Sequence, residues 1–513
     1  MKNQKNQNNQ NDENQYDVIV VGAGNGGLVA AATTAKSGLK TFLLEKNNVP
    51  GGCASSFVRG RFEFEPSLHE LCSVGTEEEP DQVTEIFNNL GVKIEWQRDD
   101  ILFRTIVKGE NGYDVKVKAG IEGFCDSLEA AVPGCRDAVH SLFDVEKINE
   151  QALAYNNKMK GKPNLLKMLI KYTDFIRSSS HSVEEMMTAL GIPEKAQNII
   201  NTYWSYLGVP TDELNAFHFL LMVNSYVKDG VVIPHYRSHE LAIALAEAVQ
   251  RFGGDIWYNS EVTQFLFNDK GAVCGVETNG RKLYAKEVIS NIIPHSVYNL
   301  SEQRHIPQIA LKLANARSFG LSMMTAYIGL DCSKEELGIE DYTIFVASDA
   351  NPRKQFDNRK KDLLYIVNCL NAIIPDCSPE GTCMLFITVP WLGSDFPATL
   401  KPKDYKKYKS EFFVKYIEDF EKLMNIDIRS HIEEIEYATP ATFARYLGTP
   451  EGTAYGYAVT KWDSVMARNT AKEKTKIPGL SFCGGHGING DGFSCAYVTG
   501  DMVAKEIIEK LGK

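Results

Sequence analysis

The most constraining feature of this sequence is a glycine-rich turn between a short apolar run and a helix of small residues. Val18–Val21 is rich in β-branched residues and predicts a buried strand. Leu28–Ser37 predicts a helix, and Gly38 supplies its stop signal. A second strand is predicted over Thr41–Leu44, and it ends on Glu45. Strand, glycines, helix, strand and acid in this order predict a unit that binds a dinucleotide.

Each glycine of the turn has a separate role in such a unit. Gly22 allows the tight turn, Gly24 lets the backbone approach a pyrophosphate, and Gly27 lets helix and strand pack closely. The helix N-terminus offers unpaired N–H groups and a positive dipole end to the phosphates. Glu45 lies 23 residues after Gly22 and is placed to accept hydrogen bonds from an adenosine ribose. An acid there fits FAD or NAD, because a 2′-phosphate would favour a cation.

Glycine-rich segments also occur just after this unit and near the C-terminus. The first follows Glu45 and Lys46 and reads PGGCASSFVRGRFEFEPSLHEL. At the far end, a predicted strand (Leu480–Cys483), a glycine-rich loop (Gly484–Gly492) and a helix (Phe493–Ile508) again bring a helix N-terminus to a turn. Two such motifs at opposite ends of the chain indicate a discontinuous cofactor domain, which is completed when the C-terminal segment returns to the N-terminal one.

These segments resemble the glutathione-reductase-like FAD flavoproteins. More narrowly, they resemble the branch that holds bacterial-type phytoene desaturases, carotenoid cis–trans isomerases and retinol saturases. That branch carries a glycine pair after the acid, then a small residue and an aromatic residue, then a Gly-x-aromatic-x-Phe-acid run near the flavin. The matching positions here are Gly51, Gly52, Phe57, Gly60, Phe62, Phe64 and Glu65. His69 stands where several members carry a histidine, whereas Pro66 and Ser67 depart from the more common small pair.

The resemblance implies FAD as the cofactor and assigns residues to it. The backbone at Glu261 and Val262 corresponds to the adenine contact. The C-terminal loop corresponds to the segment that holds the ribityl chain and the pyrimidine edge, with Gly490 and Gly492 in the family's GxG. The residues expected to contact FAD are Gly22, Gly24, Gly27, Glu45, Lys46, Gly51, Gly52, Val262, Gly484, Gly490, Asp491, Gly492 and Phe493.

The expected fold class is α/β, with a discontinuous Rossmann-like FAD-binding domain and an inserted mixed α/β substrate domain. We assign residues 16–75, 231–295 and 437–513 to the first, 76–230 and 296–436 to the second, and 1–15 to a disordered polar tail. Predicted elements of the substrate domain are helices at Val183–Leu190, Glu194–Tyr206 and Tyr408–Met424 and strands at Met323–Leu330 and Leu363–Leu370. No second GxGxxG follows a strand, which argues against a built-in NAD(P)H domain.

Composition excludes several classes of function. The 513 residues carry a formal net charge of -11, which argues against general nucleic-acid binding. Eleven cysteines without a CxxC pair predict reduced thiols in a cytoplasmic protein, with neither a disulfide framework nor a metal site. The polar N-terminus lacks the apolar stretch of a signal peptide, and no apolar run is long enough to predict a membrane-spanning helix.

One segment departs from the acidic composition. In KMKGKPNLLKMLIKYTDFIR, residues 158–177, six basic residues stand against Asp174 alone, with leucine, isoleucine and methionine between them. This pattern predicts a basic amphipathic helix that rests on an anionic bilayer surface, which would make the protein peripheral to a membrane. The alternative is a helix of the substrate domain with a solvated basic face.

The run VVIPHYRSHELAIAL, Val231–Leu245, places polar residues directly after a proline. The resembling family has Pro-x-Gly-Gly here, and the glycine pair falls on Tyr236 and Arg237. We expect Arg237 to pair with a substrate carboxylate and Tyr236 to shape the pocket, so that both join His69 as candidate catalytic residues. An acidic lipid would then be the substrate. The alternative is a shifted loop with both side chains in solvent and Ser238 as the helix N-cap.

The resemblance implies an FAD-dependent oxidoreductase that acts on carbon–carbon double bonds of a long apolar or polyene substrate, with an external electron donor or acceptor. Saturation, desaturation and isomerisation all fit. One alternative is an amine or porphyrinogen-type oxidase on the same scaffold. A second is a non-catalytic FAD-binding chaperone or trafficking protein.

Overall fold

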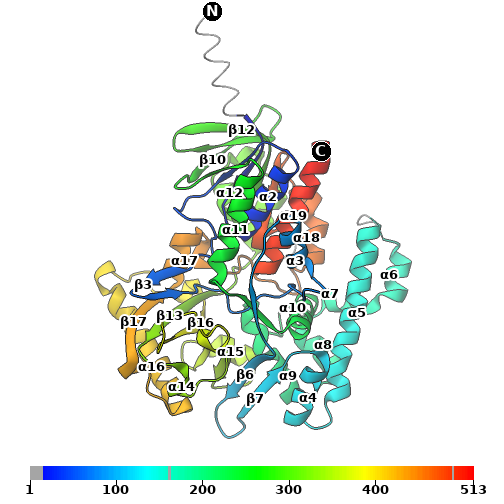
Figure 1. Cartoon of the computed structure of the whole chain (residues 1–513). Helices are drawn as coiled ribbons and strands as arrows, with labels where there is room; N and C mark the ends of the chain where they lie inside the picture. The colour runs from blue at the N-terminus through cyan, green and yellow to red at the C-terminus, as the bar shows by residue number, and fades with distance from the viewer. Residues whose placement is uncertain (1–14, 160–162, 488–489, 491) are drawn as a thin grey trace, which may run out of the picture.

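A seven-stranded sheet carries the glycine-rich unit and forms one end of the molecule (Figure 1). The computed structural model describes residues 15–159, 163–487, 490 and 492–513. The strand order is β10-β11-β12-β1-β2-β9, and β18 also pairs with β12. These strands are β1 (Gln15–Val21), β2 (Thr41–Leu44), β9 (Asp255–Trp257), β10 (Val262–Phe267), β11 (Val273–Thr278), β12 (Arg281–Ser290) and β18 (Leu480–Phe482). All pairs are parallel except those of β11 with β10 and β12.

The register of this sheet determines where a ligand can bind. Val21, the last residue of β1, lies beside Leu44 of β2 and Ser290 of β12. The carboxyl ends of three parallel strands therefore meet at Gly22, which is the edge where open α/β sheets bind ligands. On one face, α2 (Asn25–Lys36) packs against α11 (Arg237–Arg251) and α19 (Phe493–Lys510). The opposite face is covered by α12 (Pro294–Asn299) and α13 (Gln308–Ala316).

A second seven-stranded sheet lies at the opposite end of the molecule (Figure 1). Its order is β17-β13-β16-β15-β14-β6-β7, and only β14 and β6 are parallel. The strands are β6 (Ile101–Val107), β7 (Tyr113–Lys118), β13 (Ser322–Leu330), β14 (Thr343–Ala347), β15 (Leu364–Cys369), β16 (Cys383–Trp391) and β17 (Ile432–Ala438). Helix α16 (Tyr405–Met424) buries Phe413, Tyr416, Ile417 and Phe420 against one face, as its 3–4 residue spacing of apolar positions requires.

A helical lobe flanks the second sheet. It consists of α4 (Ile121–Ala131), α5 (Arg136–Lys158), α6 (Leu165–Lys171), α7 (Thr173–Ser180), α8 (Val183–Ala189), α9 (Glu194–Ile200), the 3-10 helix η1 (Asn201–Tyr206) and α10 (Ala216–Asp229). Smaller elements are the hairpin β3 (Phe57–Arg59) and β4 (Phe62–Phe64), the pair β5 (Trp96–Asp99) and β8 (Val231–Pro234), and the helices α3 (Gln82–Asn89), α14 (Lys334–Leu337), α15 (Pro352–Asn358), α17 (Pro440–Leu447) and α18 (Val465–Thr475).

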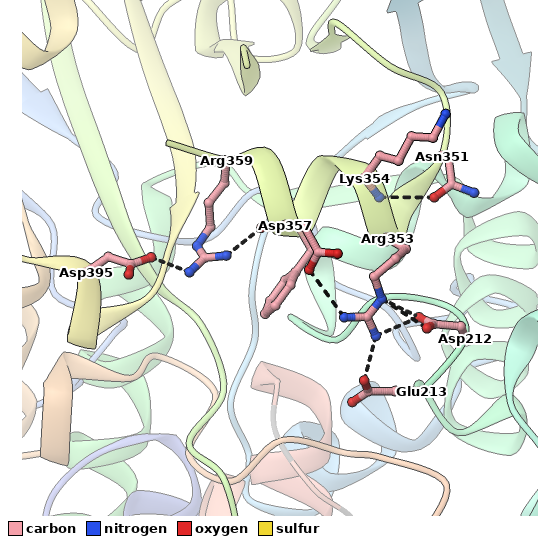
Figure 2. A network of polar contacts seen from close by, with 9 residues as sticks. Asp212, Glu213, Asn351, Arg353, Lys354, Asp357, Arg359 and Asp395 are labelled. Carbon is pink, nitrogen blue, oxygen red and sulfur yellow. Dashed lines mark hydrogen bonds and ion pairs between the residues drawn. The ribbon is translucent and has the colours of Figure 1, made fainter. Parts of the chain in front are cut away.

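Helix α15 ties the helical lobe to the second sheet (Figure 2). The guanidinium of Arg353 lies 2.9 Å from a carboxylate oxygen of Asp212 and 2.6 Å from one of Glu213. Just beyond the helix, Arg359 pairs with Asp395, which follows β16. The Arg353–Asp212 pair is two-pronged, a geometry that adds specificity to a charge-assisted hydrogen bond. These pairs hold together two parts of the chain that both line the cavity described below.

The expected α/β class with a Rossmann-like unit is confirmed. The strands predicted at Thr41–Leu44 and Met323–Leu330 match β2 and β13 within a residue. The helix predicted at Glu194–Tyr206 is α9 followed by η1, so its last turns are tighter than an α-helix. The expected second motif is also present, because β18 joins the first sheet directly ahead of α19.

The single basic helix expected over residues 158–177 was wrong. Lys158 is the last residue of α5, and the following basic residues lie on two short helices, α6 and α7. The break is at Tyr172, whose φ of -120° and ψ of 38° lie outside the helical region and whose ring is buried beside Phe175. Lys160 and Lys162 lie outside the described residues. No helix in the described ranges is both long enough and apolar enough to cross a bilayer.

Candidate active site between the two sheets

A cavity of about 570 Å³ lies between the carboxyl edge of the first sheet and the face of the second. Gly22, Gly24 and Glu45 line it on the side of the first sheet. Thr325 of β13 and Thr388 of β16 line it on the side of the second. One continuous space therefore joins the glycine turn to the inserted part of the chain.

The glycine turn has the geometry that its sequence predicts. Gly22 has a φ of +95°, a region that L-residues with a side chain rarely adopt. A Cβ atom on Gly27 would lie 2.0 Å from the carbonyl oxygen of Gly22, so only glycine lets α2 approach β1. Gly24 forms a β-bridge with Gly51, and a Cβ atom on Gly52 would lie 3.4 Å from the Cα of Gly24. The backbone is therefore bare at this part of the cavity wall.

Glu45 is held rigidly at the wall of the cavity. One of its oxygens accepts the N–H of Ala23 at 2.8 Å, and the other accepts the N–H of Asn47 at 2.8 Å. Burial raises the pKa of this carboxyl, while the two N–H groups act in the opposite direction. A carboxyl fixed at the end of β2 can accept ribose hydroxyls.

The neighbours of Glu45 bound the same end of the cavity. Lys46 donates to the carbonyl of Arg445 at 3.0 Å, and burial lowers the pKa of its amine. This contact ties the end of α17 to the first sheet. Val262, at the start of β10, also lines the cavity here together with Glu261. This end is therefore polar at its rim.

The residues expected from the C-terminal loop lie in two different places relative to the cavity. Gly492, with a φ of +98°, and Phe493 line the cavity where α19 begins. Gly484 instead packs behind the wall against Gly26, and Gly490 lies against His218. Among the described residues, neither Gly484 nor Gly490 is part of the lining, and their expected contact with a cofactor stays a prediction. Asp491 lies outside the described residues.

His69 lies at the end of the cavity that faces the second sheet. Its Nε2 lies 3.3 Å from the Oγ1 of Thr388, and its ring makes edge contacts with Tyr206 and Phe386. Burial lowers the pKa of His69 to about 4, so the imidazole is neutral at pH 7. The structure thus places this predicted residue among aromatic and hydroxyl groups.

Glu70 is a site residue that the sequence analysis missed. It lines the cavity beside His69, it is 5% exposed, and neither of its oxygens makes a well-formed hydrogen bond. Burial raises its pKa to about 8, against a smaller lowering by the hydroxyls of Tyr206 and Tyr203. The available signal was a carboxylate between His69 and Leu71 in a run with few other charges, and it is a weak one.

Arg237 and Tyr236 are not part of the cavity lining. The guanidinium of Arg237 pairs with Glu63 of β4 at 3.0 Å and is 11% exposed, while Tyr236 is 60% exposed. The expected contact of Arg237 with a substrate carboxylate is therefore replaced by an internal ion pair. The alternative is also wrong in part, because only Tyr236 points to solvent, and Ser238 lies inside α11 rather than at its N-cap.

Arg237 has a backbone conformation that glycine adopts more readily than other residues. Its φ is +65°, in the left-handed region. The turn is stabilised by Glu65, whose oxygens accept both the N–H and the hydroxyl of Ser238 at 2.8 Å. Glu65 also accepts the N–H of Leu68 at 2.9 Å. This carboxyl therefore anchors the segment that carries His69 and Glu70 to the start of α11.

Comparisons with known proteins agree with this geometry. Residues 20–90 match the family described as NAD(P)-binding Rossmann-like domain. The chain is 27% identical to all-trans-retinol 13,14-reductase of Macaca fascicularis, over 86% of this chain and 77% of the relative. It is 23% identical to chloroplastic prolycopene isomerase of Arabidopsis thaliana, over 97% and 83%.

Solved structures share the fold. Cyclohexylamine oxidase from Brevibacterium oxydans superposes with a TM-score of 0.63 and 14% identity, covering 97% of this chain and 100% of that one. The resemblance to the branch of phytoene desaturases, carotenoid isomerases and retinol saturases is confirmed by the sequence relatives. The likeness to the amine oxidase concerns the fold alone.

Proposed function

Because the chain is a relative of the retinol reductases and carotenoid isomerases, we propose that it is an FAD-dependent oxidoreductase acting on carbon–carbon double bonds of a long apolar or polyene substrate. The observation that carries this proposal is the single cavity that runs from the glycine turn to the second sheet. A dinucleotide held at one end brings its reactive ring to the other, where the lining includes Met323, Ile366 and Phe443. An apolar chain fits such a wall.

FAD fits the cofactor end. Two helix N-termini, of α2 and α19, face the cavity, and the bare backbone at Gly24, Gly51 and Gly52 leaves room for a pyrophosphate. Glu45 would accept the ribose hydroxyls and Val262 would contact the adenine. When bound, a flavin supplies hydride exchange at its N5 atom. The chain would hold the substrate against the ring, exclude water and set the protonation of neighbouring groups.

We also propose the division of the chain expected from its sequence. Residues 16–75, 231–295 and 437–513 would form the cofactor domain, and 76–230 with 296–436 the substrate domain. The strand orders of the two sheets support this division, with one overlap, because β17 (Ile432–Ala438) belongs to the second sheet. None of the eleven cysteines, all of which are among the described residues, forms a disulfide, and this supports a reducing, cytoplasmic location.

Contact with an anionic membrane surface is a further part of the proposal. On α6, Leu165, Leu166, Leu169 and Ile170 are 75%, 66%, 61% and 74% exposed, and Lys167 and Lys171 are exposed beside them. The helix lies at the outer edge of the helical lobe, away from both sheets (Figure 1). Four exposed apolar side chains among cations suit the interface of an anionic bilayer, where a long apolar substrate would be dissolved.

The two alternative functions lead to different observations. An amine oxidase would form hydrogen peroxide rapidly with amines, and its only support here is the shared fold. A non-catalytic FAD-binding protein would hold a flavin that no lipid reoxidises. The sequence relatives, which are named as a reductase, isomerases and an oxygenase, favour neither alternative.

The test is an anaerobic incubation of the dithionite-reduced holoenzyme with a panel of polyenes and unsaturated fatty acids. Product mass and retention are then measured. A gain of two hydrogens shows saturation, and an unchanged mass with shifted retention shows isomerisation. Desaturation is tested with the oxidised enzyme and shows as a loss of two hydrogens. Absence of any product, together with peroxide formation from amines, would overturn the proposal.

A further inference from the structure

The end of the cavity beside the second sheet contains a group of buried polar atoms that make no well-formed hydrogen bond. They are both carboxyl oxygens of Glu70, Nδ1 of His69, and the hydroxyls of Tyr203 and Tyr206. An unpaired buried polar group costs free energy, and one in a native structure calls for an explanation. Here Glu70, His69 and Tyr206 line the cavity, so a ligand can reach them.

The surroundings of Glu70 contain no counter-charge. The titratable groups that interact with it are Tyr203 and Tyr206 of η1, Tyr226 of α10 and Tyr342 before β14, and its own segment also carries His69 and Cys72. No cation in the described part of the chain contributes to its pKa. Burial raises the pKa of Tyr203 and Tyr206 well above the usual value and lowers that of His69.

This environment separates the groups by their ability to give up a proton. The tyrosines bind their protons too firmly, and His69 is already unprotonated at pH 7. Glu70, with a pKa of about 8, is protonated at pH 7 and can still lose its proton. It is the group of this set whose proton affinity is closest to neutral pH.

We propose that Glu70 is the proton donor of the reaction and gives its carboxyl proton to the alkene carbon next to the one that receives hydride. This assignment rests on the proposed function. One alkene carbon forms a C–H bond with hydride from the reduced flavin, which ends oxidised. The π electron pair forms the second C–H bond with the proton of Glu70. The O–H bond breaks, Glu70 is left as a carboxylate, and water restores its proton through the cavity.

The experiment compares wild-type holoenzyme with the Glu70→Gln and Glu70→Asp variants. Each is reduced with dithionite and mixed anaerobically with a polyene that the wild type saturates. Gln has nearly the same shape but no acidic proton, so the rate is expected to fall roughly 100-fold or more. The wild-type rate should decline as pH rises through about 8, because the acid form is needed. Glu70→Asp should keep that decline at a lower rate, and Glu70→Gln should lose it.

A second readout does not depend on turnover. Infrared spectroscopy of the protein in D₂O should show a protonated carboxyl C=O stretch at pH 7 that disappears as pH rises through about 8. This band should be missing in Glu70→Gln.

Glu146 of α5 offers a matched control. Its carboxyl is also buried, with a pKa raised to about 7, and it accepts from Asn149 at 2.8 Å, but it is not part of the cavity lining. Glu146→Gln should remove its own infrared band and leave the rate and its pH profile unchanged. If Glu70→Gln is as active as wild type, or if Glu70 is ionised at pH 7, the assignment is overturned while the proposed function stands. A wild type that converts no polyene overturns both.

Discussion

Gly26 and Gly484 face each other so closely that a Cβ atom on Gly26 would lie 2.6 Å from both the Cα and the backbone nitrogen of Gly484. Gly26 belongs to α2 and Gly484 follows β18, so the contact joins the two ends of the chain. Helices α19 and α2 approach each other as closely, because a Cβ atom on Gly500 of α19 would lie 2.3 Å from the carbonyl oxygen of Gly26. The cofactor end of the cavity is closed by backbone packed against backbone.

Gly26→Ala should therefore destabilise the protein and weaken flavin binding. The added methyl group meets backbone atoms that cannot rotate away, so we expect a loss of about 1–3 kcal/mol in the free energy of unfolding. Gly123→Ala in α4 is the control, because its Cβ would lie 3.2 Å from the Cβ of Lys118 and alanine favours the helix. Urea titrations and flavin absorbance measure both effects. Equal stability of the two variants would contradict the packing argument.

Glu45→Gln should weaken the binding of FAD more than that of FMN. The carboxylate accepts two backbone N–H groups and would accept the adenosine ribose, which FMN lacks. Loss of a hydrogen bond to a charged group corresponds to about 1.5–3 kcal/mol, or roughly a tenfold or greater rise in the dissociation constant. Fluorescence titration of apoprotein with each flavin gives the comparison. A uniform loss for FAD and FMN would place Glu45 outside the ribose site.

Arg237→Ala should leave the affinity for acid and methyl-ester substrates equally unchanged, because the guanidinium pairs with Glu63 and is not part of the cavity lining. Arg237→Gly should be more stable than Arg237→Ala by about 1 kcal/mol, because the φ of +65° suits glycine. Both variants lose the same ion pair, so the difference between their free energies of unfolding reports the contribution of backbone conformation alone. A selective loss of affinity for acids would restore the carboxylate role predicted from the sequence.

The stability of wild type should fall relative to Glu70→Gln as pH rises from 6.5 to 8. The folded protein keeps the proton of Glu70 up to a pKa of about 8, whereas the unfolded chain loses it near 4.5. Each pH unit in that window therefore costs the wild type up to about 1.4 kcal/mol.

His69 has the opposite effect on the pH dependence of stability, but it acts below the window from pH 6.5 to 8. Its pKa falls from 6.5 to about 4 on folding, so its contribution is lost only as pH drops below 6.5. Urea titrations of both proteins at pH 6.5 and pH 8 measure the change, expected to reach about 2 kcal/mol. A constant difference between the two proteins across the window would show that Glu70 is ionised when buried.

The apolar face of α6 should be needed for sedimentation with vesicles that contain phosphatidylserine. Replacing Leu169 and Ile170 with Asp removes exposed apolar area and adds negative charge, so binding should be lost. Reversing Lys167 and Lys171 to Glu should weaken binding about 30-fold or more, at about 1 kcal/mol for each lysine removed.

Two controls accompany the vesicle assay. Reversing Lys406 and Lys407, exposed on α16, changes net charge equally and should leave binding unchanged. Vesicles of phosphatidylcholine alone should bind weakly. Equal binding by the variants of α6 and α16 would mean that net charge, rather than this face, attracts the protein.

The elements and residues that short-range patterns specify were predicted well. A β-branched run, three spaced glycines and an acid are enough to specify β1, α2, β2 and the placement of Glu45 at the cavity. The break at Tyr172 was missed, because burial of that ring between α5 and α7 is a tertiary event that the local charge pattern does not encode. Likewise, the local sequence did not predict the left-handed backbone at Arg237.

By itself, the sequence determined the dinucleotide unit, the return of the C-terminus to it, and the family resemblance. Those features depend on local geometry, on where a Cβ atom is tolerated and on strand periodicity. Only the tertiary structure decided that Arg237 pairs with Glu63 and that Glu70 lies among tyrosines without a counter-charge. The physical reason is that the charge state and the partner of a side chain depend on solvent exclusion and on neighbours distant in sequence. Neither can be read from the residues beside it.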